Sequence, residues 1–384
     1  MSAGTDIRTP ASGEGAGGRL RSIDALRAIA ALLVVWLHVT ESFAAAGGPA
    51  LGGRALADAA WALDLGRVGV VVFFLISGFV IPPSLDMSRP APLASFAVKR
   101  LLRIYPAYWL SIPLSAFAAW WLWDRPFGAA ELLVNATLLQ DMLGVPAASG
   151  VYWTLLVELA FYALCMLLAW GGSLHHAQRI GAIALALAGL HLAIVFGFWL
   201  DGAGGTLLAL LPFHLSLMLT GSLCRQAQSG PGLPIVPRRM LRALLLFFLV
   251  VFPAGAAWAL GPAHNYAVSS ALGVAIFLAG TRLIRIESRL SDWLGRISYS
   301  IYLFHMPVFY PLLWWVTRQP LDSAWRNQHL AIWFMAVLAA TLLVAELAYR
   351  FVERPGMRLG QRWARRLQQR KAGVLPTARP RVAV

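Results

Sequence analysis

Charged side chains are scarce in this sequence of 384 residues. Only 13% of the residues are Asp, Glu, Lys or Arg, whereas 59% are hydrophobic and the mean hydropathy is +0.67. A soluble domain has roughly 25% charged residues, so the composition excludes the two or three soluble domains that the length alone would allow. A chain in lipid must satisfy its backbone hydrogen bonds internally, as a helix does. The composition therefore predicts an all-α, polytopic membrane protein.

Cysteine is also scarce, and Cys165 and Cys224 are the only two in the chain. Each falls in or at the end of an apolar segment, and together they form neither a disulfide framework nor a metal-binding pattern. The sequence also lacks a P-loop, zinc-ligand spacing, a GxGxxG motif and an internal repeat. It therefore gives no support to a metal site or a phosphate-cradling loop.

Apolar segments, in contrast, are abundant. A membrane-spanning helix needs about 20 mostly apolar residues. We expect about ten such helices, at residues 21–40, 66–83, 104–123, 151–170, 180–200, 206–224, 241–260, 266–282, 297–317 and 329–350. Residues 1–20 are predicted to be a disordered cytoplasmic tail, residues 21–355 a membrane domain, and residues 356–384 a basic cytoplasmic tail. The segment "RWARRLQQRKAG" in that last tail is predicted to form a short amphipathic surface helix.

The distribution of basic residues predicts an orientation. If the N-terminus is cytoplasmic and the ten segments alternate, 27 of the 32 Lys and Arg residues face the cytoplasm and 5 face the other side. Cytoplasmic loops are enriched in Lys and Arg, so both termini are predicted to be cytoplasmic. The protein itself is predicted to lie in the inner membrane of the cell. The net charge of +15 then reflects basic loops next to anionic lipid head groups, and not binding to nucleic acid.

The first apolar segment, "RSIDALRAIAALLVVWLHV", keeps ionisable residues that are costly in a membrane. Asp24 and Arg27 are three residues apart and share a helix face. His38 follows Arg27 by eleven residues, which is only about 20° from a whole number of turns and about 16 Å along the axis. These residues therefore line one stripe that leads into the membrane. The alternative is a structural Asp24–Arg27 ion pair beside a core histidine.

Arg100 and Arg103 lie three residues apart in "FAVKRLLRIYPAYWL", at the cytoplasmic edge of the third segment. Guanidinium groups grip phosphate through paired hydrogen bonds, so this pair suits a phosphate-rich anion. Ordinary anchoring at the membrane surface is an equal alternative.

Further ionisable groups fall inside later segments. Glu158 lies within the fourth segment, where a lone carboxylate indicates a function more often than a structural role. Ser298, Tyr302 and His305 recur at helical spacing in the ninth segment and form a polar stripe. In the second segment Ser77-Gly78 resembles part of a nucleophile elbow, but Leu75 stands where that motif needs Gly.

Glu346, Arg350 and Glu353 share a face at the end of the tenth segment. Either glutamate can pair with Arg350, so structural pairing competes with a functional role for Glu353. His191 and His214 are isolated histidines, and we interpret both as structural.

Six segments, in order along residues 21–355, resemble the acyltransferase family 3 membrane proteins. They are "IDALRAIAALLVVWLH", "GVVVFFLISGFVI", "KRLLRIYPAYWL", "WTLLVELAFYAL", "LGRISYSIYLFHMPV" and "VERP". The resemblance implies transfer of an acyl group, most often acetyl, from acyl-CoA to a hydroxyl group of a carbohydrate or related acceptor. The motifs of the family fall on Arg27 and His38 (Arg-x10-His), Arg100 and Arg103 (Arg-x-x-Arg), and Glu353 and Pro355 (Glu-x-Pro).

This chemistry needs a base, a group that stabilises the oxyanion, and a site that holds CoA. His38 is predicted to be the base, because an imidazole titrates near pH 6.5, and Asp24 or a carboxylate of another helix would orient it. Direct transfer and an acyl-histidine intermediate both fit these residues. The donor, with acetyl-CoA expected, would contact Arg27, Arg100, Arg103 and Glu353. The carbohydrate side would involve Trp153, Glu158, Ser298, Tyr302 and His305.

Two other classes of membrane protein compete with the enzyme. A transporter or flippase would also line a path with polar groups, but the sequence has no two-fold hydropathy repeat and no matching pair of broken helices. A structural or sensory protein would leave the cost of placing Glu158 and His38 in the membrane unexplained.

Overall fold

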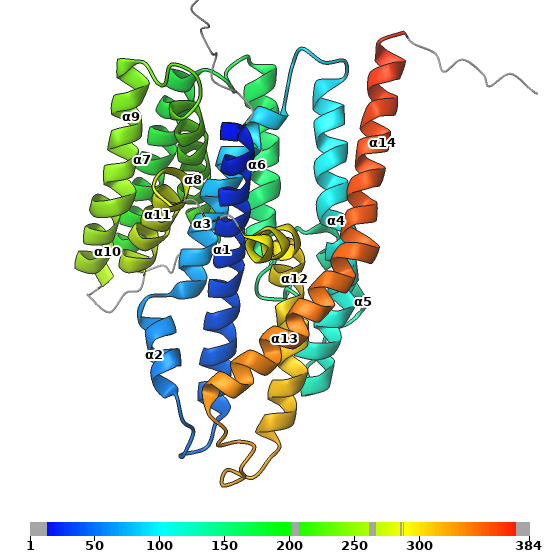
Figure 1. Ribbon diagram of the computed structural model, residues 1–384. Coiled ribbons are helices and arrows are strands. Elements are labelled where there is room, and N and C mark those ends of the chain that lie inside the picture. Colours follow the sequence, from blue (N-terminus) through cyan, green and yellow to red (C-terminus); the bar gives the residue numbers. More distant parts are fainter. Residues whose placement is uncertain (1–13, 202–206, 261–265, 285, 287, 374–384) are drawn as a thin grey trace, which may run out of the picture.

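A computed structural model describes residues 14–201, 207–260, 266–284, 286 and 288–373 of the chain. The described residues form helices and connecting segments without a strand (Figure 1). The α-helices are α1 (Glu14–Ala46), α2 (Arg54–Ala62), α3 (Leu65–Val80), α4 (Pro92–Ala119), α5 (Ala129–Thr137), α6 (Trp153–Trp170), α7 (Ala177–Asp201), α8 (Leu207–Ala227), α9 (Ile235–Leu246), α10 (Phe252–Leu260), α11 (Tyr266–Arg282), α12 (Arg289–Thr317), α13 (Leu330–Ala348) and α14 (Arg354–Lys371). The prediction of an all-α fold is confirmed.

Helices occupy all ten positions that the apolar segments predict. Within the described residues, five helical stretches are long and apolar enough to cross a membrane: Ser22–Ala46, Leu65–Ser84, Trp153–Trp170, Ala177–Val195 and Leu330–Lys371. Helices α4 and α12 carry many Tyr, Trp, Pro and Ser residues, which lower their hydropathy. The structure thus supports a membrane protein with several apolar helices, and the number of ten spans stays a prediction.

The structure differs from the sequence prediction at both ends of the membrane domain. Helix α1 begins at Glu14, inside the predicted tail of residues 1–20, while residues 1–13 lie outside the described residues. At the other end, the π-helical turn η4 (Tyr349–Glu353) joins α13 to α14 without a break. The predicted short surface helix is therefore the end of a long continuous helix. A π-turn inserts an extra residue into a helix and is frequent at functional sites.

Short elements between the long helices were not predicted. They are α2, α5, the 3-10 turns η1 (Pro82–Ser84) and η2 (Trp121–Trp123), and the π-turn η3 (Phe247–Val251), which joins α9 to α10. Each of the helices α2 and α5 has only 9 residues, too few to give a clear periodic signal beside the apolar runs.

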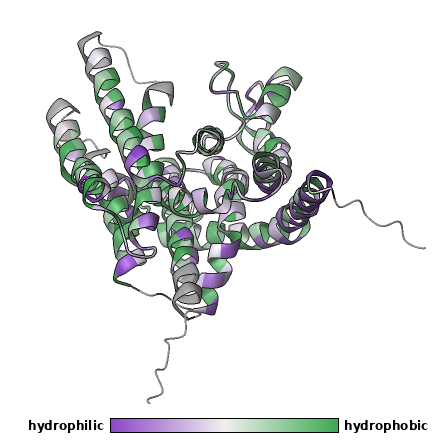
Figure 2. Cartoon of the chain, turned by 90° about the horizontal axis from the view of Figure 1, so that it is seen from above, coloured by the Kyte–Doolittle hydropathy of each residue, from purple (hydrophilic) through white to green (hydrophobic). Residues whose placement is uncertain are grey.

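Helix α1 lies inside the bundle, packed against α3 and α12 (Figure 1). The start of α1 and the end of α14 both lie toward the top of the bundle in Figure 1, opposite to α2. Seen from above, α14 is coloured mostly as hydrophilic and lies at the edge of the bundle, where it packs against α4 (Figure 2). Which membrane face the two ends share stays a prediction.

Helices α3 and α8 cross at very short range through two glycines. A Cβ atom added at Gly78 would lie 1.7 Å from the carbonyl oxygen of Met218, and one added at Gly221 would lie 2.2 Å from that of Leu75. Small residues let membrane helices approach so closely, because dispersion contacts replace the missing hydrophobic driving force in lipid. This crossing fixes α3, which carries part of the site, against α8.

Candidate functional site

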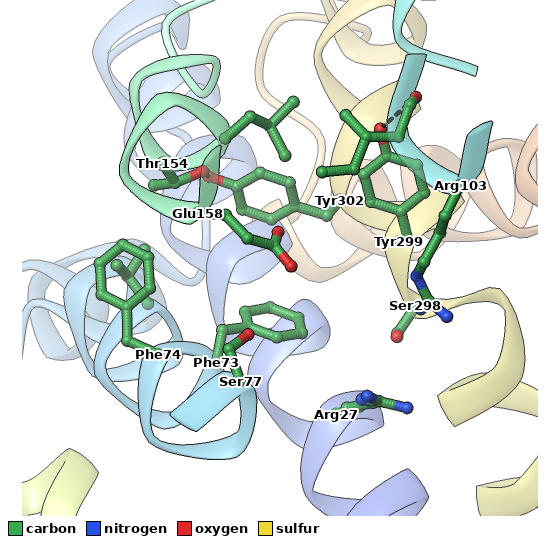
Figure 3. A pocket seen from close by; sticks show the side chains of 13 residues that line it. Arg27, Phe73, Phe74, Ser77, Arg103, Thr154, Glu158, Ser298, Tyr299 and Tyr302 are labelled. Atoms are coloured by element: carbon green, nitrogen blue, oxygen red, sulfur yellow. Dashed lines mark hydrogen bonds between the residues drawn. The ribbon is translucent and has the colours of Figure 1, made fainter. Parts of the chain in front are cut away.

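A pocket opens between α1, α3, α4, α6 and α12 (Figure 3). Its lining mixes charged, hydroxyl-bearing and aromatic side chains: Arg27, Val70, Phe73, Phe74, Ser77, Arg103, Ile104, Thr154, Leu155, Glu158, Ser298, Tyr299 and Tyr302. Helix α1 contributes Arg27, α4 contributes Arg103, and α6 contributes Glu158. Five of the residues predicted from the sequence thus meet at one pocket: Arg27, Arg103, Glu158, Ser298 and Tyr302.

The charged groups of the pocket are only partly neutralised by their neighbours. Arg27 lies 3.5 Å from the carboxylate of Asp24, and its side chain stays 25% exposed. Glu158 accepts a hydrogen bond of 2.5 Å from the hydroxyl group of Tyr162. In Figure 3 the side chains of Arg27, Arg103 and Glu158 point toward the same space. The lining holds two guanidinium groups and one carboxylate, with Asp24 paired to Arg27 beside it, and guanidinium groups are suited to bind an anionic ligand.

The sequence predicts that Asp24 could orient His38, but the structure places Asp24 too far from His38 for this role. Asp24 pairs with Arg27 on the first turns of α1. Fourteen residues separate Asp24 from His38 on this helix, which is about 21 Å along the axis. This prediction is therefore wrong: a shared helix face does not bring two side chains within reach when four turns lie between them.

Glu353 is buried in the π-turn η4, with 1% of its surface exposed. Its Oε2 atom accepts a hydrogen bond of 2.8 Å from the Ser300 hydroxyl on α12, and Arg103 interacts with it electrostatically. Arg350 pairs with Glu346 instead, and Trp293 donates a hydrogen bond of 2.8 Å to that same carboxylate. The alternative of a Glu353–Arg350 pair is thus excluded, and Glu353 contacts α12 behind the pocket.

The hydroxyl groups at the α6 side of the pocket form a connected set. The hydroxyl of Tyr302 lies 2.8 Å from that of Thr154 and donates to the Val151 carbonyl at 3.1 Å. Ser298 donates to the Gly295 carbonyl, one turn earlier on α12, at 2.8 Å. The bonds to Thr154 and Val151 hold Tyr302 at the start of α6, with its ring facing the pocket (Figure 3).

His305 is the member of the predicted polar stripe that does not line the pocket. It is fully buried, and its ring stacks on that of His38 with the centroids 5.5 Å apart and an interplanar angle of 24°. Its Nδ1 atom lies 2.7 Å from the Tyr302 carbonyl oxygen. The structure therefore joins the base predicted on α1 to a second imidazole on α12.

Arg100 and Trp153 also lie outside the pocket lining. The Arg100 guanidinium donates to the Ser84 hydroxyl at 2.5 Å and lies over the rings of Phe96 and Tyr162. Trp153 packs against His214, with ring centroids 5.3 Å apart. Of the Arg-x-x-Arg pair, only Arg103 reaches the pocket.

The sequence analysis did not single out Phe73, Thr154 or Tyr299, and it gave Ser77 little weight. Helical spacing could have found Phe73 and Thr154, because Phe73 lies four residues before Ser77 and Thr154 four residues before Glu158. Tyr299 donates a hydrogen bond of 2.9 Å to the Ile104 carbonyl across the α4–α12 contact, which no local pattern predicts. Within the described residues, no cluster of His, Cys, Asp and Glu suits a metal ion.

Residues 20–350 match the family described as "Acyltransferase domain". The chain belongs to this acyltransferase family. The family prediction made from six sequence segments is thereby confirmed, and the matched residues include every residue that lines the pocket. No solved structure matches the chain.

Three relatives show how far the similarity extends. Nodulation protein 10 of Rhizobium leguminosarum bv. viciae is 28% identical, over 91% of this chain and 96% of the relative. The exopolysaccharide production protein ExoZ of Rhizobium meliloti is 28% identical, over 80% of this chain and 94% of the relative. The peptidoglycan O-acetyltransferase OatA of Listeria monocytogenes is 25% identical, over 87% of this chain and 55% of the relative. Two of these names refer to polysaccharides.

Proposed function

We propose that the protein is a membrane O-acyltransferase that moves an acyl group, with acetyl the expected one, from acyl-CoA to a hydroxyl group of a carbohydrate or glycoconjugate. The observation that carries the proposal is the meeting of Arg27, Arg103 and Glu158 at one pocket, in a chain of the acyltransferase family. The peptidoglycan O-acetyltransferase among the relatives favours acetyl as the group and a cell-envelope polysaccharide as the acceptor.

The two arginines are the proposed contacts for the donor. Guanidinium groups bind phosphate through charge-assisted, often paired hydrogen bonds, so Arg27 and Arg103 suit the phosphates of CoA. Arg100, one turn before Arg103 on α4, extends the basic surface toward the end of the bundle that is predicted to be cytoplasmic. From Arg27 to His38 is about 16 Å along α1, a distance that the extended pantetheine arm of CoA can span.

His38, which lies outside the pocket lining, is the proposed base of the reaction. His38 takes the proton of the acceptor hydroxyl as its oxygen attacks the thioester carbonyl carbon. The new C–O bond forms, the C–S bond breaks, and the departing CoA thiolate takes the proton from the His38 imidazolium. In the alternative route the imidazole itself carries the acyl group between donor and acceptor. Tyr302 and Thr154 would contact the acyl group or the acceptor between the pocket and His38.

An acyl-transfer assay with purified protein in lipid nanodiscs tests the proposal. The protein is incubated with [¹⁴C]acetyl-CoA and a mixture of cello-oligosaccharides, chito-oligosaccharides and muropeptides. Alkali-labile label in an oligosaccharide is expected, since an O-acetyl ester is cleaved by base. Absence of label from every acceptor, with the protein folded, would contradict the function. Sealed vesicles loaded with the same acceptors distinguish a transporter, which would move them without labelling.

A further inference from the structure

His305 carries a buried polar atom that has no partner. Its side chain is fully buried, and its Nε2 atom makes no hydrogen bond within the described part of the chain. The Nδ1 atom lies 2.7 Å from the carbonyl oxygen of Tyr302. A carbonyl oxygen can only accept, so Nδ1 holds the proton and Nε2 presents a free lone pair.

A buried acceptor without a donor costs free energy, and such groups in native proteins call for an explanation. Phe304 and Phe309 on the same helix are also fully buried, so α12 packs apolar rings close to His305 in the sequence. His305 stacks between two rings, His38 at 5.5 Å and Phe309 at 6.5 Å. Packing alone therefore does not account for an imidazole at this position.

His38, whose ring stacks on that of His305, lacks an orienting group of its own. No hydrogen bond to its ring occurs among the described residues, and Asp24, the carboxylate on the same stripe, lies about 21 Å away along α1. Glu158 on α6 is bonded to Tyr162. A histidine that acts as a base needs a fixed tautomer, which a hydrogen bond to the second ring nitrogen sets.

We propose that His305 is a positioning residue for His38: its Nε2 atom accepts the N–H of the His38 ring and so presents the other His38 nitrogen to the acceptor hydroxyl. The proposal includes a rotation of the His38 ring out of the stacked arrangement, so that its N–H can reach Nε2. This inference rests on the proposed function of His38 as the base. During transfer the hydroxyl proton goes to the free nitrogen of His38 and then to the CoA thiolate, while His305 stays neutral and keeps its hydrogen bond.

Three substitutions separate this role from packing. His305→Gln keeps an acceptor oxygen close to the position of Nε2 and loses the Nδ1 donor. His305→Asn keeps a donor for the Tyr302 carbonyl and loses the Nε2 acceptor. His305→Phe keeps an aromatic ring and loses both ring nitrogens. All three are compared with wild type by the initial rate of label transfer from [¹⁴C]acetyl-CoA into the oligosaccharide mixture, and their folding is checked by thermal unfolding in nanodiscs.

We expect His305→Asn and His305→Phe to lower kcat by about 10²-fold, as a misplaced reacting group does, with little change in the KM for acetyl-CoA. His305→Gln is expected to retain much more activity than either. Equal or higher activity of the Asn variant compared with the Gln variant, or a Phe variant as active as wild type, would overturn the proposal.

A second measurement does not depend on activity. In protein labelled with ¹⁵N in the histidine rings, NMR reports the tautomer of His38, assigned by comparison with His38→Asn. One tautomer is expected in wild type and a mixture in His305→Asn; the same mixture in both would refute the inference. Wild-type protein could show one His38 tautomer, and His305→Asn a mixture, while wild-type protein transfers no label. That outcome would contradict the proposed function and still support the contact between His305 and His38.

Discussion

The helices that line the pocket and the helices of residues 177–282 use their polar side chains in different ways. In α7 to α11 several hydroxyl groups bond to helix carbonyls, as Ser216 does to Ala184 at 2.7 Å and Ser270 to Phe248 at 3.1 Å. Around the pocket, Arg27, Arg103 and Glu158 keep charge directed into an open space. No described residue of α7 to α11 lines that pocket. From this comparison we predict that α7 to α11 serve as a scaffold and that the other half carries the proposed chemistry.

The largest expected effect on the transfer rate comes from His38, and a histidine of the other half serves as its control. His38→Ala removes the proposed base, and general base catalysis contributes typically 10²- to 10⁴-fold, so the rate of acetyl transfer should fall by about that factor. His214, buried in α8 among Phe74, Phe213 and Trp153, serves as the control. His214→Phe should leave the rate close to wild type. A similar loss in both variants would break the division between the two halves.

The next effect concerns the arginine that reaches the pocket. Arg103→Ala removes charge-assisted hydrogen bonds worth about 1.5–3 kcal/mol, so the KM for acetyl-CoA should rise roughly 10- to 100-fold. Arg89, which is exposed and paired with Asp86 at 3.0 Å, gives the matched control variant Arg89→Ala. If initial rates over a range of acetyl-CoA concentrations show equal KM values for the two variants, Arg103 does not bind the donor.

The crossing of α3 and α8 joins the two halves, and its effect should appear in stability. Gly78→Ala forces a methyl group against the Met218 carbonyl, and such overpacking costs typically about 1–3 kcal/mol. Thermal unfolding followed by size-exclusion recovery should show a clear loss. Gly189→Ala on α7, where a Cβ atom meets nothing within 4 Å, should match wild type. Equal stability of the two variants would mean that the crossing is not tightly packed.

The smallest effect is expected for a single hydroxyl in the scaffold. Ser216→Ala removes the hydrogen bond to the Ala184 carbonyl, and such bonds between membrane helices contribute on average about 0.6 kcal/mol. A small drop in the unfolding temperature with an unchanged transfer rate is the expected result. A marked loss of activity would place α7 and α8 in the functional half.

The sequence predicts those features of the site that depend on one helix. Three-residue spacing predicts that Asp24 and Arg27 share a face, and the structure places them 3.5 Å apart. Four-residue spacing likewise brings Ser298 and Tyr302 to the same pocket. Helical periodicity is a local property, so it can be read before the helices are assembled.

Features that depend on how helices cross could not be predicted from the sequence. The stacking of His38 on His305 requires α1 to lie against α12, and the choice of Arg350 for Glu346 over Glu353 depends on the π-turn η4 and on Ser300. The end of the tenth helix was placed too early, because the basic composition after Arg358 suggested a tail. Close helix crossings, such as that of Gly78 against the Met218 backbone, determine these contacts, and such crossings leave no periodic signal in the sequence.

Protection of a cysteine in the pocket tests the central claim most directly, namely that acyl-CoA binds between Arg27, Arg103 and Glu158. Ser77 lines the pocket and is partly exposed, and the two native cysteines are buried. In Ser77→Cys protein, acetyl-CoA should slow labelling by a maleimide in a concentration-dependent manner. Ser229→Cys, on the exposed connection after α8, should label at the same rate with or without acetyl-CoA. Labelling of Ser77→Cys that is unaffected by saturating acetyl-CoA would contradict the account.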